Sequence, residues 1–298
     1  MRVLVTGGGG FIGAWIIRRL AAPGTEIRVF DSSADRSLVR AIAGAAVTDA
    51  LEWIVGDVTD GAALRRAAES CDRLVHLAAM LTPACRADPI RGAQVNLIGT
   101  LNLFEAARAQ GIGTVAYMSS AGVFGLKDGR IPLPDTHYGA FKLACEGCAR
   151  AYWADHGIAS VGFRPYIVYG PGREVGLTAG PSIACRAAAR GEAYTIPFGG
   201  RADYLYVEDL AEAFAVVCTT PLRGAAAYTL VGEAADAVEV AAAIARLAPG
   251  AAIDAAGPGL PVTADLDPGP VRTVFPAIPR TSLADGLART IAWYREAE

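Results

Sequence analysis

The sequence predicts a doubly wound α/β fold, in which a parallel sheet carries helices on both faces and a smaller C-terminal part follows. Three observations predict it. Short apolar runs alternate with helical stretches through the first half, a glycine-rich turn follows the first apolar run, and the pattern changes after Arg164. Strands that alternate with helices of this length are typical of βαβ units. Because such crossovers are right-handed, we expect helices on both faces of the sheet.

The expected elements follow in order along the chain. Parallel strands are expected at residues 2–6, 26–30, 53–55, 74–77, 115–118 and 160–164. The main helical patterns between them lie at residues 11–21, 89–110 and 138–156. Beyond a glycine- and proline-containing turn at residues 169–172, we expect a strand at 204–207 and helices at 181–190, 208–219, 236–247 and 282–295.

Length and composition argue against several classes of protein. The chain has 298 residues, of which 53% are hydrophobic and 19% charged, so it is not a disordered chain and has room for roughly two domains. The net charge of −3, without a basic run, argues against a nucleic-acid partner. The chain lacks an apolar run long enough for a membrane span. Six sparse cysteines favour a reduced, cytoplasmic setting, and we expect no metal site.

A run of glycines lies between the first expected strand and the first expected helix. Thr6-Gly-Gly-Gly-Gly-Phe-Ile-Gly13 fits G-x-x-G-x-x-G through Gly7, Gly10 and Gly13, and it also fits G-x-G-x-x-G through Gly8. In this context the pattern is the fingerprint of a Rossmann-type dinucleotide site, where the helix N-terminus receives the pyrophosphate. The alternative is a glycine loop that only turns the chain.

Two aspartates follow the second and third expected strands. Asp31 comes 18 residues after Gly13, where a carboxylate accepts hydrogen bonds from the ribose hydroxyls of NAD and repels the 2′-phosphate of NADP. The alternative for Asp31 is a helix N-cap, and Arg36 offers a charge that offsets the repulsion. Asp57, with Val58, is expected at the adenine edge, or else in an ordinary turn.

Tyr138 and Lys142 stand at positions i and i+4 of an expected helix, so their side chains share a face. A free tyrosine has a pKa of about 10, and a nearby ammonium group lowers it toward the range useful for proton transfer. Ser119 and Ser120 follow the strand expected at residues 115–118, at the edge where open α/β sheets bind ligands. A serine there can hydrogen-bond a substrate oxygen, or it can cap a loop.

In this order the motifs resemble the extended short-chain dehydrogenase/reductases, which form the NAD-dependent epimerase/dehydratase family. Further matches are His76-Leu-Ala-Ala79, Val95-Asn-Leu-Ile-Gly-Thr100, Ser119-Ser-Ala-Gly-Val-Phe-Gly125, Val168-Tyr-Gly-Pro-Gly172 and Asp203-Tyr-Leu-Tyr-Val-Glu-Asp209. The resemblance implies that Tyr138 is the catalytic base and acid, that Lys142 activates it, and that Ser120 holds the substrate oxygen. It favours Ser120 over Ser119 because Ser120 directly precedes the Ala-x-Val-aromatic-Gly run.

The resemblance also implies NAD as cofactor and a set of contacts for it. The residues expected at NAD are Gly7, Gly10, Phe11, Ile12, Asp31, Asp57, Val58, Leu77, Ala78, Ala79, Asn96, Tyr138, Lys142 and Tyr166. Those expected at a small-molecule substrate are Met80, Ser119, Ala121, His137, Arg173 and Arg201. We expect a Rossmann domain at residues 1–168, to which residues 203–231 return, and a mainly substrate-binding domain at residues 169–298. A homodimer is expected to pack through the helices at 89–110 and 138–156.

Departures from the family pattern narrow the range of reactions that the chain can catalyse. The 4,6-dehydratases carry an Asp-Glu pair where this chain has Ala121 and Gly122, so dehydration is rejected. The nucleotide-sugar 4-epimerases place an Asn where Ile167 stands and an Arg where Ala202 stands. Each lost polar contact to a buried diphosphate costs about 1–3 kcal/mol.

The sequence therefore predicts NAD-dependent hydride transfer at a secondary alcohol or ketone carbon of a sugar or sugar-like substrate. The enzyme is either an epimerase or a dehydrogenase of this class. The departures favour a dehydrogenase acting on a non-nucleotide substrate, whereas the frequency of epimerases in the family favours an epimerase. The alternatives are a nucleotide-sugar 4-epimerase with an atypical diphosphate site and a non-catalytic dinucleotide-binding protein.

Overall fold

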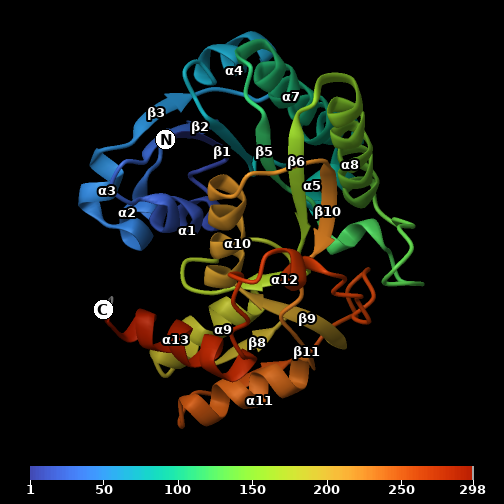
Figure 1. Cartoon of the computed structure of the whole chain (residues 1–298). Helices are drawn as coiled ribbons and strands as arrows, with labels where there is room; N and C mark the ends of the chain where they lie inside the picture. The colour runs from blue at the N-terminus through green and yellow to red at the C-terminus, as the bar shows by residue number, and fades with distance from the viewer. Residues whose placement is uncertain (297–298) are drawn as a thin grey trace.

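The computed structural model describes residues 1–296 and has two lobes (Figure 1). Within these residues, the N-terminal lobe is built on a sheet of seven strands in the order β10-β6-β5-β4-β1-β2-β3. Every neighbouring pair in this sheet is parallel. Its strands are β1 (Arg2–Thr6), β2 (Glu26–Asp31), β3 (Glu52–Val55), β4 (Arg73–His76), β5 (Thr114–Met118), β6 (Ala159–Arg164) and β10 (Ala225–Thr229). The predicted doubly wound parallel α/β fold is confirmed.

Helices cover both faces of this sheet because alternate strand residues point to opposite sides. In β1, Val3 and Val5 pack in one apolar cluster with helix α1, whereas Leu4 packs in a second cluster with helices α4 and α7. The helices of the first face are α1 (Phe11–Leu20), α2 (Ser37–Ala43) and α10 (Val207–Thr219), with α3 (Ala45–Asp49) beside α2. Those of the second are α4 (Gly61–Ala67), α7 (Gly99–Gln110) and α8 (His137–His156).

The helix expected over residues 89–110 is divided in the structure. It comprises α6 (Pro89–Ala93), a π-helical turn at Gln94–Ile98 and α7. The turn carries Asn96, whose side-chain oxygen accepts a hydrogen bond from the N–H of Met80 at 2.9 Å and whose side-chain amide donates to the carbonyl of Met80 at 3.0 Å. A π-helical turn contains about one residue more than an α-helical turn. Here the turn carries the asparagine that holds the loop after β4. That loop continues into α5 (Thr82–Ala87).

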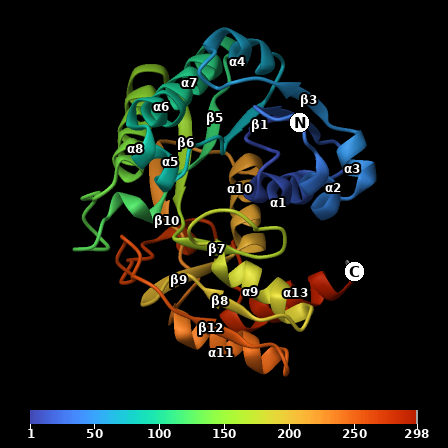
Figure 2. The same ribbon diagram turned by 180° about the vertical axis from the view of Figure 1, so that it is seen from behind.

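The C-terminal lobe combines two small sheets with four helices of residues 1–296 (Figure 2). One sheet has the order β11-β9-β7 and the other pairs β12 with β8. The strands are β7 (Ile167–Tyr169), β8 (Tyr194–Ile196), β9 (Arg201–Tyr206), β11 (Glu233–Asp236) and β12 (Ile253–Ala255). The helices are α9 (Gly180–Ala189), α11 (Ala237–Leu247), α12 (Val271–Val274) and α13 (Leu283–Glu296).

Two separate segments of the chain form the C-terminal lobe, and between them the chain returns to the large sheet. Helix α10 packs against α1 and β5, and β10 then pairs in parallel with β6, with Ala225 opposite Ser160. Residues 203–206 belong instead to β9 of the three-stranded sheet. The division into a cofactor domain and a substrate domain stays a prediction.

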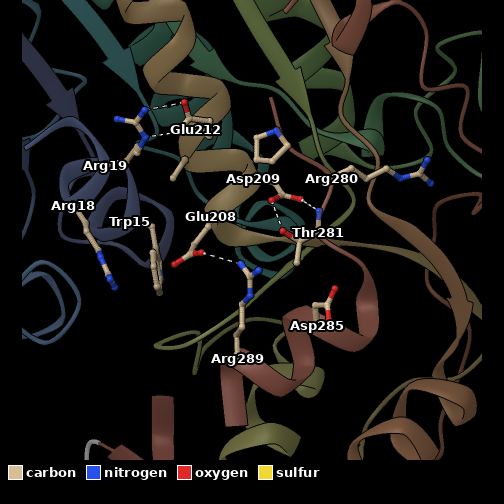
Figure 3. Close-up of a pocket in the computed structure, with 12 residues that line it drawn as sticks. Trp15, Arg18, Arg19, Glu208, Asp209, Glu212, Arg280, Thr281, Asp285 and Arg289 are labelled. Atoms are coloured by element: carbon tan, nitrogen blue, oxygen red, sulfur yellow. Dashed lines mark hydrogen bonds and ion pairs between the residues drawn. The ribbon is translucent and has the colours of Figure 1, made fainter. Parts of the chain in front are cut away.

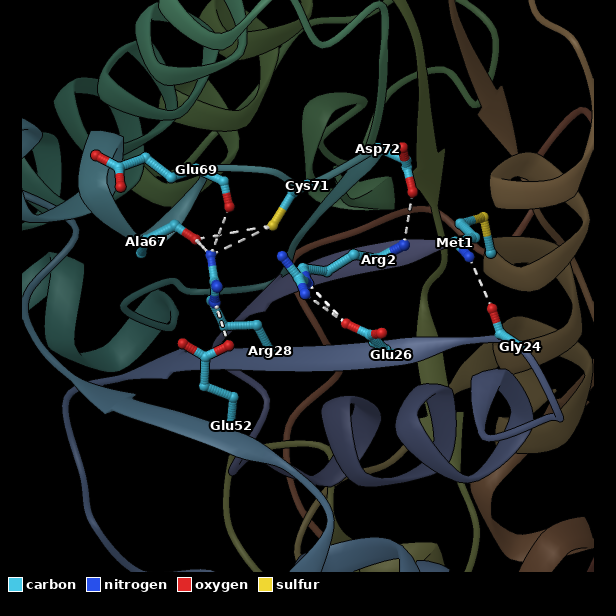
Figure 4. Close-up of polar contacts among 10 residues, drawn as sticks. All are labelled: Met1, Arg2, Gly24, Glu26, Arg28, Glu52, Ala67, Glu69, Cys71 and Asp72. Carbon is cyan, nitrogen blue, oxygen red and sulfur yellow. Dashed lines mark hydrogen bonds and ion pairs between the residues drawn. The ribbon is translucent and has the colours of Figure 1, made fainter.

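Polar contacts tie together the N-terminal ends of the strands (Figure 4). Arg2 forms an ion pair with Glu26 at 2.6 Å, and its backbone N–H donates to Asp72 at 2.6 Å. Arg28 pairs with Glu52 at 2.7 Å. The loops of the candidate site lie at the opposite edge, where the parallel strands end, as is usual for open α/β sheets. Among the described residues, no helix combines the length and the apolar character that a bilayer span requires.

Candidate active site

The glycine run forms a tight cradle at the carboxyl end of β1. Gly7 has a φ of 70°, and a Cβ at this position would lie 2.7 Å from the backbone nitrogen of Ala78. A Cβ at Gly13 would lie 2.6 Å from the carbonyl oxygen of Gly7. Helix α1 begins at Phe11, and no side chain of residues 1–296 caps it. Its first N–H groups are therefore available to a phosphate, as a pyrophosphate site requires.

A cavity of about 510 Å³ opens from this cradle along the ends of β1, β2 and β4. Its lining includes the residues expected at NAD that follow these strands, with several others. The lining residues are Gly7, Gly9, Gly10, Phe30, Asp31, Ser32, Ser33, Asp35, Gly56, Asp57, Val58, Leu77, Ala78, Ala79, Met80, Arg91 and Val95. The glycines at the start of α1, the free N–H groups of the helix and the carboxylate of Asp31 line one cavity, so the described residues fit NAD.

Asp31 lies at the end of β2, in the wall of this cavity. One carboxylate oxygen accepts the N–H of Gly9 and the other accepts the N–H of Ser33, both at 2.9 Å. A carboxylate offers further lone pairs, which remain for ribose hydroxyls. Asp31 does not cap helix α2, which begins only at Ser37. The guanidinium group of Arg36 lies 5.1 Å from the ring centre of Trp53, so Arg36 is stacked on the tryptophan.

Asp57 makes the hydrogen bonds of an ordinary turn and also lines the cavity, and its expected place at the adenine stays a prediction. Its carboxylate accepts hydrogen bonds from the N–H and hydroxyl of Thr59 at 2.9 and 2.8 Å, which is turn chemistry. The same residue lines the large cavity and forms an ion pair with Arg91. Sequence reasoning did not single out Arg91, because its pairing with Asp57, 34 positions away, depends on how α6 packs beside the end of β3.

Tyr138 and Lys142 lie on one face of α8, as the spacing predicts. The helix starts where the Thr136 hydroxyl accepts the N–H of Gly139 at 3.0 Å. The Nζ of Lys142 lies 5.7 Å from the centre of the Tyr138 ring and donates a 2.7 Å hydrogen bond to the carbonyl of Met118 at the end of β5. Lys142 is 2% exposed, and its burial lowers its pKa.

Ser120 lies in extended backbone between β5 and a short 3₁₀ turn, Ala121–Val123, and its hydroxyl accepts the N–H of Gly122 at 3.0 Å. Burial raises the pKa of Tyr138 to about 12, and the hydroxyl of Ser120 and the charge of Arg173 act in the opposite direction. The phenol is therefore held protonated at neutral pH in this structure, ready to donate a proton.

A smaller cavity of about 140 Å³ contains Ser120 and Tyr138. The other residues that line it are Leu81, Thr82, Pro83, Gly122, Thr136, Tyr166, Arg173, Gly176, Leu177, Thr178, Leu260, Pro261 and Val262. The hydroxyl of Tyr166 donates a 2.8 Å hydrogen bond to the carbonyl of Val262, so the C-terminal lobe closes one wall. Tyr166, expected at NAD, thus lies in the smaller cavity rather than the larger one.

The remaining expected site residues divide between these walls and other places. Met80 and Arg173 line the larger and the smaller cavity, respectively. Phe11 and Ile12 start α1 beside the glycine cradle. Asn96 is buried and does not line the larger cavity itself, but it hydrogen-bonds Met80, which does. Ala121 is fully buried. His137 is exposed and stacks on Phe141, with ring centres 6.3 Å apart. Arg201 is exposed on β9 and is not among the described residues that line either cavity.

Ser119 faces the protein interior, away from both cavities. Its hydroxyl donates a 2.5 Å hydrogen bond to Glu146 of α8, and Glu146 also accepts a bond from Arg164 at 2.7 Å. Sequence reasoning did not single out Glu146, although it continues the i, i+4 series of Tyr138 and Lys142. That periodicity is the one signal that could have found it.

A larger hollow of about 610 Å³ lies elsewhere, between α1, α10 and the start of α13 (Figure 3). Its charged side chains largely pair with one another. Arg289 lies 3.6 Å from Glu208, Arg19 pairs with Glu212, and Asp209 accepts the N–H and hydroxyl of Thr281, both at 2.7 Å. This hollow is a polar seam between the two lobes, distant from Tyr138 in the sequence and in the fold. Among residues 1–296 there is also no cluster of His, Cys, Asp and Glu that could hold a metal ion.

Comparisons with known proteins agree with this geometry. A profile of the "NAD dependent epimerase/dehydratase family" matches residues 3–231. A UDP-glucose 4-epimerase of Mycolicibacterium smegmatis is 31% identical over 99% of both chains. A dTDP-glucose 4,6-dehydratase of Streptomyces niveus is 28% identical over 99% of this chain and 93% of its own length. The crystal structure of the Thermus thermophilus UDP-glucose 4-epimerase with NAD is 29% identical, covers 100% of both chains and has a TM-score of 0.84.

The profile match covers most of the chain, and the relatives match along nearly their whole lengths. The predicted resemblance, the NAD cofactor and the enzymatic character are therefore confirmed. The chain is an enzyme that transfers hydride between NAD and a sugar or sugar-like substrate. It belongs to the NAD-dependent epimerase/dehydratase family.

Proposed function

We propose that this enzyme is a dehydrogenase or reductase that acts on a secondary alcohol or ketone of a small polyhydroxylated substrate carrying no nucleotide. The observation that carries the proposal is the small cavity around Ser120 and Tyr138, of about 140 Å³. A cavity of about 150 Å³ is known to accept a benzene-sized ring. A single small polyol therefore suits this site, whereas a nucleoside diphosphate sugar is far larger.

The positions that would hold a diphosphate support the same proposal. Ile167 of β7 and Ala202 of β9 are both buried, at 0% and 1% exposure, and both pack in the apolar core. Neither side chain offers a hydrogen-bond donor, and a buried anion without donors is costly. The hydrogen bond from Tyr166 to Val262 holds residues 260–262 in the wall of the small cavity.

The proposed chemistry assigns a role to each residue of the catalytic set. NAD, when bound, supplies the hydride acceptor. Tyr138 takes the hydroxyl proton of the substrate in oxidation and returns it in reduction. Ser120 hydrogen-bonds the reacting oxygen, and its hydroxyl is already oriented by the N–H of Gly122. Lys142 is anchored on Met118 and places its positive charge beside the Tyr138 ring, where it favours the ionised phenol.

For the cofactor we propose the contacts that line the larger cavity. The first N–H groups of α1, above Gly7 and Gly10, would receive the pyrophosphate, and Asp31 would accept the ribose hydroxyls. Asp57 and Val58 would border the adenine. Leu77, Ala78 and Ala79 form the floor of the cavity toward Tyr138.

The second candidate is a nucleotide-sugar 4-epimerase. It is favoured by the UDP-glucose 4-epimerase relative, 31% identical over 99% of this chain. It would require the loop at residues 260–262 to leave Tyr166 and open a path for the nucleotide.

Two measurements separate the candidates. The first is the nucleotide released on denaturing the purified enzyme. Tightly held, stoichiometric NAD would favour an epimerase, in which the cofactor is regenerated at each turnover. The second is turnover of polyols, sugar acids and UDP-sugars, with Tyr138→Phe as the inactive control. It is followed as NADH formation for oxidation and as interconversion of the two 4-epimers for UDP-sugars, because an epimerase forms no net NADH. Turnover of UDP-sugars alone would overturn the proposal.

We also propose a homodimer that packs through α7 and α8. Ile98, 44% exposed, lies just before α7, and the outer face of α8 presents small residues that permit close approach, among them Ala140, Ala144, Gly147 and Ala151. Sedimentation that gives the mass of a monomer at micromolar concentration would reject this arrangement. A cytoplasmic location is proposed because all six cysteines, which lie among the described residues, are free thiols.

A further inference from the structure

Arg173 is held in place by a turn that is fixed from both lobes. The turn follows β7 and contains Pro171 and Gly172. The indole N–H of Trp15 in α1 donates a 3.0 Å hydrogen bond to the carbonyl of Pro171. The N–H of Gly172 donates to the hydroxyl of Tyr294 in α13 at 2.9 Å, and the φ of Gly172 is 85°. This anchoring directs the Arg173 side chain into the cavity that holds Tyr138.

The Arg173 guanidinium group uses only part of its hydrogen-bonding capacity within the protein. One terminal nitrogen donates to the carbonyl of Val168, and the other donates to the hydroxyl of Thr178 at 2.7 Å. The group also lies 5.8 Å from the centre of the Phe11 ring. Since arginine carries five N–H donors, three remain for a ligand.

The charge of Arg173 has no acidic partner in the part of the chain that the structure describes. None of the ion pairs among residues 1–296 includes it. Burial lowers the pKa of Arg173 to about 10, which reflects the cost of this charge away from water. A half-buried cation without a counter-charge favours an anion beside it.

The surroundings limit which anion fits. Arg173 is the one cation among the described residues that line the small cavity, and much of the rest of the lining is apolar, with Leu81, Pro83 and Leu177 near it. A single guanidinium group balances one negative charge and matches the two oxygens of a carboxylate. A phosphate carries more negative charge than one guanidinium group balances, and the excess charge would be uncompensated among the apolar residues of this cavity.

We propose that Arg173 binds the carboxylate of the substrate, so that the substrate is a hydroxy acid such as an aldonic or uronic acid. This inference rests on the proposed function, because it assigns the substrate class of the same small cavity. The carboxylate at Arg173 and the reacting carbinol at Ser120 and Tyr138 then belong to one small molecule. Binding of the acid at one end orients the carbinol at the other.

Another source of an oxyanion is the pyrophosphate of NAD, because Arg173 stacks near Phe11 at the start of α1. We favour the substrate carboxylate over the pyrophosphate as the partner of Arg173. Among residues 1–296, Arg173 lines the small cavity together with Tyr138 and is not in the lining of the larger cavity. The two sources predict different losses when the charge is removed, so one experiment distinguishes them.

The test compares wild type with Arg173→Met, which removes the charge, and Arg173→Lys, which keeps it. Arg66→Met, on the exposed face of α4, is the matched control. Each protein is assayed with a panel of aldonic and uronic acids and with the methyl ester of each. Binding of the same acids to enzyme without added NAD is measured by calorimetry, and NAD binding is measured separately.

We expect wild type to prefer the acid over its ester and Arg173→Met to lose on the order of 100-fold in kcat/KM for the acid. Because the charge of Arg173 also lowers the pKa of Tyr138, turnover of the ester should fall as well, but by much less than turnover of the acid. The acid-to-ester ratio is therefore the readout, and the Kd for NAD should stay within a few-fold of wild type. Arg173→Lys should recover part of the preference, which also shows that the variant site is folded. Calorimetric binding of the acid should weaken in Arg173→Met in the same proportion.

Three results would overturn the inference. They are an unchanged acid-to-ester ratio in Arg173→Met, a weakened Kd for NAD with acid binding intact, and turnover of neutral small polyols only. Failure of the proposed function itself has a different signature, namely turnover of UDP-sugars alone.

Discussion

The hydroxyl of Ser119 donates a 2.5 Å hydrogen bond to the carboxylate of Glu146 inside the protein. Ser119 follows β5, Glu146 lies on α8, and the same carboxylate pairs with Arg164 at the end of β6. The side chain of Glu146 is 0% exposed. Three elements are therefore joined directly beneath the catalytic set. The bond fixes the end of the strand that presents Ser120 against the helix that presents Tyr138.

Removal of Glu146 should destabilise the fold strongly. Glu146→Ala leaves Arg164 buried without its partner, a change that typically costs about 3–5 kcal/mol. Ser119→Ala, which removes one hydrogen bond, should cost about 1 kcal/mol. The measurement is urea unfolding of both variants, with Glu26→Ala, whose partner Arg2 lies at the surface, as the control that changes little. Equally small losses of unfolding free energy in all three variants would show that the buried pair of Glu146 and Arg164 contributes no more to stability than the surface pair.

Tyr138→Phe should reduce turnover by about 10²–10⁴-fold, because the proton-transferring hydroxyl is lost. The Kd for NAD should change only a few-fold, because the hydroxyl lies in the smaller cavity. Tyr152→Phe, on the same helix but bonded to Glu105, is the matched control. Initial rates and equilibrium titration with NAD give the two readouts. Turnover in Tyr138→Phe equal to that of Tyr152→Phe would remove Tyr138 from the mechanism.

The oxidation rate should rise with pH through the neutral and alkaline range. In the proposed mechanism oxidation needs the phenolate of Tyr138, and burial raises the pKa of this phenol to about 12, so the phenolate is the minor form. Reduction uses the protonated phenol and should be nearly constant over the same range. The check is kcat/KM against pH in both directions. A plateau of the oxidation rate already at neutral pH would mean that the charges of Lys142 and the bound cofactor overcome burial.

Asp31→Asn should weaken the preference for NAD over NADP. The substitution removes the negative charge that repels a 2′-phosphate, while the side-chain oxygen can still accept the N–H of Gly9. We expect the ratio of kcat/KM for NAD to that for NADP to fall by about 10-fold or more. Asp35→Asn, in the same wall, serves as the control. An unchanged ratio would indicate that another residue sets the preference.

His76 should make the fold sensitive to acid. The ring is buried between the hydroxyls of Thr6 and Thr100, at 2.7 and 3.1 Å, and burial lowers its pKa from 6.5 to about 3. The unfolded chain therefore binds this proton more readily than the native state. The free energy of unfolding should fall by several kcal/mol as the pH drops from about 6.5 to about 3. Urea midpoints across this range should decline less steeply in His76→Gln than in wild type.

The sequence and the structure agree best where local rules decide. Alternation of strands and helices predicted the large sheet, and the spacing of Tyr138 and Lys142 predicted a shared helix face. Ser119 is expected at the substrate but faces Glu146, whereas Ser120 lines the small cavity; consecutive residues near a strand end point to opposite sides. The roles of these residues in catalysis stay predictions.

Features that depend on distant residues could not be predicted in this way. The π-helical turn at Asn96 accompanies its bonds to Met80, and the closed wall of the small cavity depends on Tyr166 meeting Val262, 96 positions away. Arg173 is a substrate candidate by the family resemblance. Its lack of an acidic partner became visible only when the surrounding side chains were in place, because pairing is a property of three-dimensional neighbours.

The position of β10 has a consequence for how the protein is made. During synthesis, β1 to β6 leave the ribosome first, and β7, α9, β8 and β9 follow before residues 225–229 can pair with β6. Until then the backbone of β6 presents an unpaired edge, which is the kind of surface that recruits other nascent chains. The N-terminal lobe is thus completed only after a large part of its neighbour has been translated. A ribosome that stalls between residues 170 and 224 would release a chain with an open sheet, prone to aggregation.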